Sequence, residues 1–273
     1  MRTVSLPDGG TMPVLGLGTW MMGERKAVAA SELAALKLGL DLGFNLIDTA
    51  EMYGNGGAET IVAAAIAGRR DEIFLVSKVL PQNASRTGTV RACEASLKRL
   101  GTDRLDLYLL HWAGNHPVDD TIEGFEQLKR AGKILRWGVS NFDHAEMEPL
   151  DGTAVASNQV LYNLARRGIE FDLLPWCRAR SIPVMAYSPI EQGRILSNRA
   201  LVSLAQARGC SAAQLALAWV LRQDGVVTIP KASNLAHVRE NRAALDMVLS
   251  DAECAALDKA FPPPTKPTAL AML

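Results

Sequence analysis

Four side chains capable of acid–base chemistry follow three successive apolar segments of the chain. Asp48 ends the first segment, Tyr53 lies five residues further on beside Gly54, Lys78 follows the second segment, and His111 follows the third. Short apolar runs bounded by glycine or by polar residues indicate buried strands. The segments are Asn45–Asp48, Ile73–Ser77 and Leu105–Leu110. A charge at the end of a buried strand is costly unless it is paired, so we expect Asp48 to meet a partner from a neighbouring strand.

Each of these side chains alone has a structural explanation. An aspartate–lysine pair is more often structural than catalytic, a lone tyrosine is a loop aromatic, and a lone histidine is more often part of a core. Four such groups at adjacent strand ends indicate a functional site, because active sites gather titratable groups in one place. The site therefore depends on a fold that brings the ends of these strands together.

Strand-like and helix-like patterns alternate along the whole chain. The predicted strands are Leu15–Thr19, Asn45–Asp48, Ile73–Ser77, Leu105–Leu110, Leu135–Val139, Val155–Ser157, Pro183–Tyr187 and Val226–Ile229. The predicted helices are Ser31–Leu42, Ala58–Ala67, Thr87–Leu100, Thr121–Ala131, His144–Leu150, Phe171–Arg180, Leu201–Arg208, Ser211–Arg222, Asn234–Leu245 and Ser250–Lys259. Ser31 and Ser211 are suitable helix N-caps. Eight strands each followed by a helix predict an α/β fold, a (β/α)8 TIM barrel, as a single domain over residues 1–273.

Two features at the chain ends complete this prediction. Val4–Leu6 and Thr11–Pro13 flank an Asp-Gly turn and predict an N-terminal hairpin that could plug one end of the barrel. The last predicted helix is an extra C-terminal one. A doubly wound open sheet is the main rival, but the Gly16-x-Gly18 pair has Met21 at the third glycine position, so the dinucleotide fingerprint fails. In a barrel, residues at the carboxyl ends of the strands share one face, so the four acid–base groups should converge there.

Composition narrows the function classes. The chain has 273 residues, 29 Lys plus Arg and 29 Asp plus Glu, which gives a formal net charge of zero. Without a basic cluster we expect no nucleic-acid partner. No apolar run is long enough for a bilayer, and the N-terminus lacks a signal-peptide pattern, so we expect no membrane partner and a cytoplasmic location. The four cysteines show no metal-ligand spacing, and we interpret them as reduced thiols.

Several motifs, in this order and spacing, resemble those of the aldo-keto reductases over nearly the whole chain. They are Asp48-Thr49-Ala50-x-x-Tyr53-Gly54, Val76-Ser77-Lys78, Leu109-Leu110-His111-Trp112, Gly138-Val139-Ser140-Asn141-Phe142, Asn158-Gln159-Val160, Tyr187-Ser188-Pro189, Ile229-Pro230-Lys231 and Glu240-Asn241. Within this family the chain is similar to the short bacterial reductases, which include enzymes acting on methylglyoxal. The resemblance implies an oxidoreductase that transfers hydride from a reduced nicotinamide to the carbonyl carbon of a small aldehyde or dicarbonyl.

The resemblance also implies a role for each member of the group. Tyr53 would give a proton to the carbonyl oxygen as it becomes an alkoxide. The ammonium of Lys78 would favour the phenolate and so make Tyr53 a better donor. Asp48 would keep that ammonium charged and aimed, and His111 would orient the carbonyl oxygen by a hydrogen bond. This chemistry requires no metal.

The remaining motifs are implied to bind the cofactor, NADPH or alternatively NADH. Ser140, Asn141 and Gln159 would bind the nicotinamide carboxamide, and Tyr187 would stack on its ring. The loop Ile190–Arg194, with Ser188, Gly193 and Arg194, would hold the pyrophosphate. Lys231 would meet the ribose phosphate, and Glu240 and Asn241 the adenine. Family members that prefer NADPH usually carry serine and arginine where this chain has Ala232 and His237; Ser233, Arg239 or Arg242 could compensate.

The segments that could cover the predicted substrate pocket are short, so we expect this pocket to be open. The segment after His111 is short, and the chain stops soon after Pro264. We therefore expect an uncovered apolar pocket with weak selectivity. We also expect the protein to be a monomer or a weak oligomer. Its predicted lining is Trp20, Met52, Leu80 and Trp112.

Two functions of other classes remain as alternatives. A barrel with a buried lysine could be a Schiff-base aldolase using Lys78, although a neighbouring Asp48 would keep that amine protonated. The chain could instead be a nicotinamide-binding regulatory or structural protein of the same fold, with vestigial catalysis. The complete set of four acid–base residues argues against this second alternative.

Overall fold

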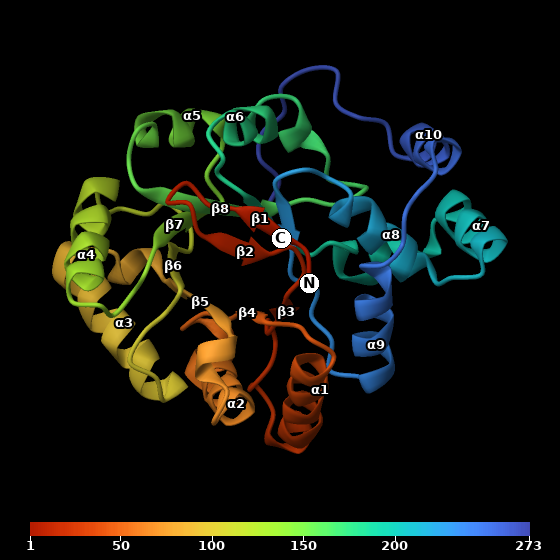
Figure 1. Ribbon diagram of the computed structural model, residues 1–273. Helices are drawn as coiled ribbons and strands as arrows, with labels where there is room; N and C mark the ends of the chain where they lie inside the picture. Colours follow the sequence, from red (N-terminus) through yellow and green to blue (C-terminus); the bar gives the residue numbers. More distant parts are fainter.

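The computed structural model describes residues 1–273, and its centre is a sheet of eight parallel strands surrounded by helices (Figure 1). The strands pair in chain order: β3 (Leu17–Gly18), β4 (Leu46–Asp48), β5 (Phe74–Val79), β6 (Leu107–Leu110), β7 (Trp137–Ser140), β8 (Val155–Leu161), β9 (Val184–Tyr187) and β10 (Val226–Thr228). Parallel neighbours need a crossover connection, and a helical segment follows each strand. The predicted α/β barrel class is confirmed.

The first and last strands meet and close the sheet into a barrel. Leu15 pairs with Thr228 and Gly18 with Lys231 in parallel bridges, and the Gly16 N–H donates to the Thr228 carbonyl over 2.9 Å. A Cβ on Gly18 would lie 2.4 Å from the Ile229 carbonyl oxygen, so only glycine permits this close approach. Gly18, half of the incomplete dinucleotide fingerprint, therefore serves barrel closure.

The helices lie outside the strands and match the predicted ones within a few residues. They are α1 (Ala29–Asp41), α2 (Gly57–Ile66), α3 (Arg86–Leu100), α4 (Val118–Arg130), α5 (His144–Met147), α6 (Leu173–Ala179), α7 (Arg199–Arg208), α8 (Ala212–Leu221), α9 (Leu235–Ala244) and α10 (Asp251–Ala260). The short 3-10 turns are η1 (Lys26–Val28), η2 (Tyr53–Gly56), η3 (Arg70–Glu72), η4 (Pro81–Asn83), η5 (Glu148–Leu150), η6 (Gly168–Glu170) and η7 (Glu191–Ser197). The extra C-terminal helix is α10, which packs beside α7 (Figure 1).

Local capping explains most of the helix boundaries. Ser211 and Ser250 each accept from the third backbone N–H of their helix in a capping box, as a serine N-cap should. Ser31 behaves differently from the prediction: it lies inside α1, where its hydroxyl donates to the Val28 carbonyl over 2.8 Å. The helix starts earlier because η1 leads directly into its first turn.

The N-terminal hairpin closes one end of the barrel interior. β1 (Thr3–Ser5) and β2 (Thr11–Pro13) pair antiparallel, and Figure 1 shows them lying across the strands. Leu6 and Met12 are buried against the inward-facing apolar side chains of the barrel, among them Leu46, Val76 and Leu107. A plugged end leaves the opposite, carboxyl end of the strands for a site.

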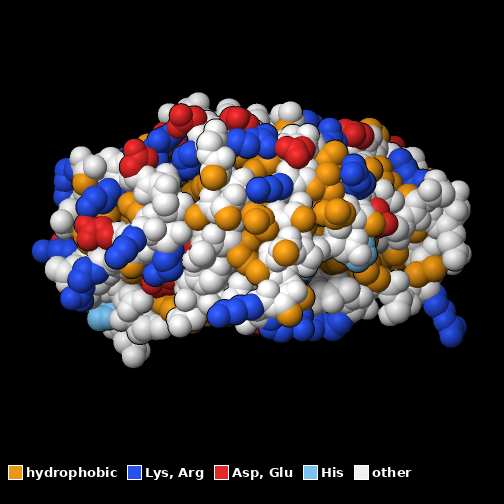
Figure 2. Space-filling model, turned by 90° about the horizontal axis from the view of Figure 1, so that it is seen from below, with side chains coloured by type: hydrophobic (Ala, Val, Ile, Leu, Met, Phe, Trp, Pro, Cys, Tyr) orange, Lys and Arg blue, Asp and Glu red, His pale blue; other side chains and the backbone are white.

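The outer surface combines apolar and charged side chains on the same face. On the face seen in Figure 2, hydrophobic side chains gather across the middle, and basic and acidic side chains lie around them. None of the helices combines the length and apolar character that a membrane crossing requires. No three His, Cys, Asp or Glu side chains are arranged to hold a metal ion, and all four cysteines are free thiols.

Candidate active site

Strand alternation places the acid–base residues inside the barrel. Successive side chains of a strand point to opposite faces, so residues two apart share a face. Asp48 follows the inward-facing Leu46, Lys78 follows Val76, and His111 continues the series of Leu107 and Leu109. Lys78 lies within β5 rather than after it, and it remains on the inward face. Period-two spacing thus directs all three groups to one end of the barrel interior.

The lysine ammonium is the centre of this group. Lys78 Nζ lies 2.8 Å from Asp48 Oδ2, 2.8 Å from the Thr49 carbonyl oxygen and 3.2 Å from the Tyr53 hydroxyl. All three partners are within hydrogen-bonding distance, so the three ammonium protons can each have an acceptor. Lys78 is fully buried, and Asp48 is 2% exposed. The ion pair that we expected for Asp48 is therefore present and shielded from water.

Burial and charge act in opposite directions on this pair. Burial lowers the pKa of Lys78, but the charge of Asp48 and the hydrogen bonds to Asp48 and Tyr53 outweigh it and raise that pKa above its usual value. The amine stays protonated, so it is a poor Schiff-base nucleophile. This geometry argues against the aldolase alternative.

The phenol differs from the sequence expectation in its net acidity. Burial raises the pKa of Tyr53, and the Lys78 charge lowers it, with a net increase over the ordinary value. Lys78 thus acts in the expected direction, but desolvation of the phenolate is the larger effect. Tyr53 remains a protonated phenol at neutral pH and can serve as a proton donor.

His111 lies beside the phenol as a neutral ring. Its centroid is 5.7 Å from that of Tyr53, edge to face, and 4.8 Å from that of Trp112. Burial, and secondarily the Lys78 charge, lower the pKa of His111 to about 2. Its buried Nδ1 atom has no hydrogen-bond partner in the protein. A neutral imidazole here can hydrogen-bond a ligand but does not supply a proton from an imidazolium.

A chain of polar side chains continues from this group across the barrel. Gln159 Nε2 donates to Asp48 Oδ1 over 2.8 Å, and Ser140 Oγ donates to the Gln159 carbonyl over 2.9 Å. Asn141 Nδ2 donates to the His111 carbonyl over 3.1 Å, and the Tyr187 hydroxyl donates to Asn141 Oδ1 over 2.9 Å. Residues predicted separately from sequence are therefore one connected network.

These residues border a cavity of about 820 Å³ at the carboxyl end of the barrel. This volume is within the range of ligand clefts. Sixteen of the sequence-predicted site residues line it: Trp20, Asp48, Met52, Tyr53, His111, Trp112, Ser140, Asn141, Gln159, Tyr187, Ser188, Gly193, Lys231, His237, Glu240 and Asn241. The cavity extends from Tyr53 to the β10–α9 connection.

Four predicted residues do not line the cavity. Lys78 is buried beneath it, where it contacts Tyr53. Leu80, which we predicted to line the substrate pocket, is not among the lining residues, and its N–H donates to Glu51 Oε1 over 2.7 Å. Arg194 contacts Glu191 and Gln192, and Ser233 Oγ accepts from Lys231 Nζ over 2.8 Å. The Ser233 hydroxyl is therefore held by Lys231, a residue that does line the cavity.

The cavity also includes residues that the sequence reasoning missed. The first turn of α8 contributes Ser211, Ala212 and Ala213, and the C-terminal residues Met272 and Leu273 lie at the cavity as well. The expectation of a pocket left uncovered by the tail was therefore wrong. The tail has no regular pattern that would place it, whereas the Ser211 capping motif did mark a helix start that parallel-barrel geometry directs to this face.

Comparisons with known proteins agree with this arrangement. A family model described as aldo/keto reductase family matches residues 14–261. Methylglyoxal reductase YeaE of Escherichia coli (strain K12) is 52% identical over 272 residues, covering 96% of each chain. Glyoxal reductase of Bacillus subtilis (strain 168) is 36% identical over 259 residues, covering 94% of this chain and 91% of that protein. A crystal structure of an aldo/keto reductase from Klebsiella pneumoniae in complex with NADP and acetate superimposes with a TM-score of 0.96 at 51% identity, covering 100% of this chain and 99% of that chain. The protein described here belongs to the aldo/keto reductase family.

Proposed function

We propose that this protein is an NADPH-dependent reductase of small aldehydes and dicarbonyls, of which methylglyoxal is the model substrate. The observation that carries the proposal is the buried Asp48–Lys78 ion pair bonded to the Tyr53 hydroxyl, beside neutral His111, at a cavity of about 820 Å³. The similarity to YeaE and to a relative crystallised with NADP supports the same activity.

Tyr53 is the proposed proton donor. When bound, NADPH supplies the hydride that reduces the carbonyl carbon. The carbonyl oxygen then carries growing negative charge, and the Tyr53 hydroxyl transfers its proton to that oxygen. Lys78, 3.2 Å from the hydroxyl, stabilises the phenolate that remains. Asp48 holds the ammonium in place, so no metal is needed for this step.

His111 is proposed to orient the substrate. Because its pKa is lowered to about 2, the ring is neutral at any working pH and offers an N–H donor to the carbonyl oxygen. A donor aimed at the position where charge develops stabilises the transition state. The edge-to-face packing against Tyr53 keeps the two groups on the same side of the cavity.

The polar network is proposed to seat the nicotinamide. Ser140, Asn141 and Gln159 would bind its carboxamide. Because Gln159 Nε2 already donates to Asp48, the Oε1 atom of Gln159 is available to accept a hydrogen bond from the carboxamide. The Tyr187 ring would stack on the nicotinamide, with its hydroxyl fixed by Asn141. These side chains fit the group because they are polar, lie at the same cavity and already hold one another in place.

The rest of the cofactor would extend toward α9. Ser188, Gly193 and Arg194 would hold the pyrophosphate, and Lys231 with Ser233 and His237 would meet the ribose phosphate. Glu240 and Asn241 would contact the adenine. Of the further candidates, Arg242 is committed to the Leu42 carbonyl and to Asp246, so it is not available to the phosphate. NADH is the proposed second, weaker cofactor.

Trp20, Met52 and Trp112 are proposed as the substrate pocket. Trp20 is 40% exposed and Met52 is 38% exposed, and both line the cavity, so each offers apolar surface to a bound substrate. Such a surface favours small carbonyl compounds. We further propose a monomer or weak oligomer in the cytoplasm, where free thiols persist.

Tyr53→Phe tests the proposed function. The variant keeps the ring and loses the hydroxyl, so reduction of methylglyoxal by NADPH should fall by roughly a hundred-fold to ten-thousand-fold. The dissociation constant for NADPH, from quenching of tryptophan fluorescence, should stay the same. Activity within a few-fold of wild type would reject Tyr53 as the donor, and a wild type that binds NADPH without reducing any aldehyde would support the vestigial alternative.

A further inference from the structure

The loop between β9 and α7 has an unusual backbone. Ser188, Glu191 and Gln192 have φ angles of 47°, 51° and 54°, and Gly193 follows at 87°. A left-handed conformation is costly for residues other than glycine, by about 1–3 kcal/mol each, and persists only when surrounding contacts impose it. Ser188, Gln192 and Gly193 line the cavity, so the strained backbone borders the proposed pyrophosphate site.

Glu191 is the one residue of this strained run that turns away from the cavity. Its side chain is 5% exposed and accepts hydrogen bonds from Arg166 Nε over 2.9 Å, from Asn163 Nδ2 over 2.8 Å and from Arg194 over 3.3 Å. The carboxylate is thus satisfied at both oxygens. Burial raises the pKa of Glu191, and the bonds from Arg166 and Asn163 outweigh it and lower that pKa.

Asn163 connects the same loop to β8. It is fully buried, and its amide N–H groups donate to Glu191 Oε2 and to the Ser188 carbonyl over 2.9 Å. Its Oδ1 accepts from the backbone N–H groups of Ala165 and Arg166 over 2.9 and 3.1 Å. One side chain therefore ties two residues of the strained run, Ser188 and Glu191, to the segment after β8.

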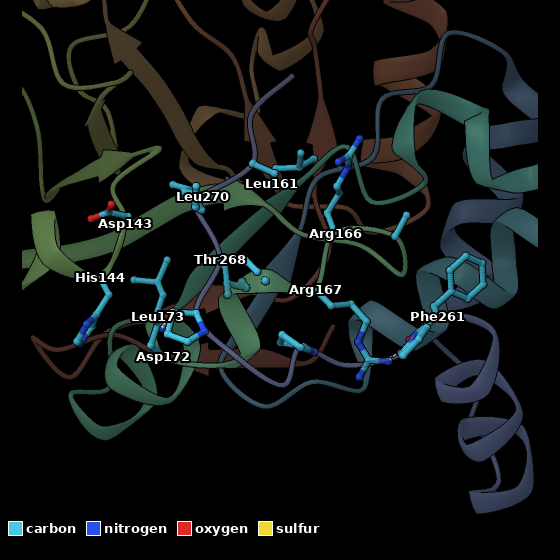
Figure 3. Close-up of a pocket in the computed structure, with 18 of the residues that line it drawn as sticks. Asp143, His144, Leu161, Arg166, Arg167, Asp172, Leu173, Phe261, Thr268 and Leu270 are labelled. Carbon is cyan, nitrogen blue, oxygen red and sulfur yellow. Dashed lines mark hydrogen bonds between the residues drawn. The ribbon is translucent and has the colours of Figure 1, made fainter.

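Arg166 supplies the countercharge to Glu191. Figure 3 shows Arg166 and Arg167 leaving the same stretch of chain in opposite directions, with Arg167 directed to Phe261. Arg167 is bound by Glu170 and Asp258, so it anchors the start of the C-terminal tail. Arg166 is the member of the pair that reaches Glu191.

We infer that Asn163, Arg166 and Glu191 form a positioning cluster that holds the Ser188–Gly193 loop in its cofactor-binding conformation. The inference rests on the proposed function, because it concerns how that same site is kept ready for NADPH. None of the three residues lines the cavity. They act through the loop backbone. Their hydrogen bonds keep this backbone in its strained conformation, which the loop would not maintain without them.

The inference predicts a specific kinetic split. Without the cluster, the loop occupies its binding conformation for only part of the time, and the apparent dissociation constant rises by the inverse of that fraction. Glu191→Ala and Asn163→Ala should therefore weaken NADPH binding by about tenfold or more. At saturating NADPH, kcat for methylglyoxal should stay within about twofold, since Tyr53, Lys78 and His111 keep their contacts.

Two further variants separate positioning from backbone strain and from loss of folding. Glu191→Gly removes the carboxylate but also the cost of the positive φ at this position, so it should bind NADPH more weakly than wild type and less weakly than Glu191→Ala. Glu191→Gln keeps an acceptor oxygen and should recover part of the affinity. Arg104→Met removes another arginine ion pair, with Asp71, and serves as the matched control with unchanged affinity.

The experiment measures NADPH dissociation constants by tryptophan fluorescence, together with kcat, KM and the thermal unfolding midpoint of each variant. Weaker NADPH binding with kcat retained and folding intact supports the cluster. Unchanged affinity in Glu191→Ala and Asn163→Ala, or wild-type affinity in Glu191→Gly, overturns it while leaving the proposed function standing. If Glu191→Ala fails to fold, the partly exposed Arg166→Met takes its place with the same criteria. A wild type that binds no NADPH would reject the proposed function and, with it, this inference.

Discussion

At the scale of single residues, the site depends on one buried ion pair. Lys78 and Asp48 are both out of water, where separating such a pair by removing one partner typically costs 3–5 kcal/mol. The pair therefore affects both the electrostatic environment of the site and the stability of the fold. Tyr53 and Gln159 add hydrogen bonds to it, so its geometry is defined from several directions.

The two partners should differ in their effect on catalysis. Lys78→Met removes the charge that stabilises the Tyr53 phenolate and should abolish detectable reduction of methylglyoxal. Asp48→Asn keeps a hydrogen-bond acceptor for Lys78 and should reduce kcat/KM less, while lowering the free energy of unfolding by roughly 3 kcal/mol because the ammonium loses its countercharge. The measurements are matched steady-state kinetics and urea denaturation. A larger kinetic loss in Asp48→Asn than in Lys78→Met would contradict this order.

His111 should make the stability of the protein depend on pH. Its folded-state pKa of about 2 lies below the ordinary value of 6.5, so between these two pH values the unfolded chain binds more protons. Stability is then complete above the unfolded pKa and falls as the pH drops. At pH 5 the loss from this residue is about 2 kcal/mol.

The measurement is the change in free energy of unfolding between pH 7.5 and pH 5. His111→Asn should show a change smaller by about 2 kcal/mol than that of wild type. His116→Asn is the control, because it leaves His111 in place and should behave like wild type. Equal changes in wild type and His111→Asn would show that the imidazole is protonated in the folded state.

At the scale of elements, the residues of the proposed cofactor site come from the ends of strands and from the start of a helix. The ends of β7, β8 and β9 carry the groups proposed for the nicotinamide, and the start of α9 carries His237 beside the end of β10 with Lys231. The Lys231 ammonium is already bonded to Ser233. The charge available to a ribose phosphate is therefore modest.

His237→Arg tests how α9 contributes to cofactor preference. Arginine is permanently charged and offers a planar fork of donors to a phosphate. A hydrogen bond to a charged group is worth about 1.5–3 kcal/mol, which corresponds to roughly tenfold or more in affinity. The variant should tighten NADPH binding by that factor and leave NADH nearly unchanged.

The measurement is a pair of dissociation constants, for NADPH and NADH, in each variant. His144→Arg places the same charge on α5, outside the cavity, and should alter neither constant. An equal effect of His237→Arg on both cofactors would mean that the side chain does not face the phosphate. Ser233 or Arg239 would then be the residue to test.

At the scale of the whole molecule, the C-terminal segment connects two regions of the carboxyl face. Pro264, Thr268 and Leu270 line a second pocket, in which Figure 3 shows Thr268 and Leu270, and Met272 and Leu273 line the catalytic cavity. These two apolar side chains line the same cavity as Trp20 and Met52. The cavity is therefore lined by parts of the chain that are far apart in sequence, and we expect both to influence the substrate range.

We expect the enzyme to reduce methylglyoxal and other small aldehydes far better than bulky steroid ketones. Replacing both Met272 and Leu273 by alanine should widen the pocket and raise kcat/KM for the bulky ketones by about tenfold relative to methylglyoxal. Steady-state kinetics over a panel of carbonyl compounds measure both effects. Higher efficiency with steroids than with small aldehydes in the wild type would refute the prediction.

Local patterns in the sequence were sufficient for the fold class and for the group of acid–base residues. Alternating strands and helices imply a parallel barrel, and period-two spacing directs Asp48, Lys78 and His111 to one face, so their convergence follows from backbone geometry alone. The Ser211 cap and the N-terminal hairpin were predictable for the same reason: each depends on residues close together in the chain. The assignment of cofactor and reaction came from the resemblance of motifs in a fixed order.

Tertiary packing decided what no local pattern encodes. The net rise in the pKa of Tyr53 depends on how much protein covers the phenol, and the course of the tail from Pro264 to Leu273 depends on packing rather than on periodicity. Leu80 does not line the cavity, and its N–H donates to the carboxylate of Glu51, 29 residues earlier. The contacts of Glu191 with Asn163 and Arg166 likewise join residues more than 20 positions apart. Burial and long-range contacts of this kind exist only after the chain has folded.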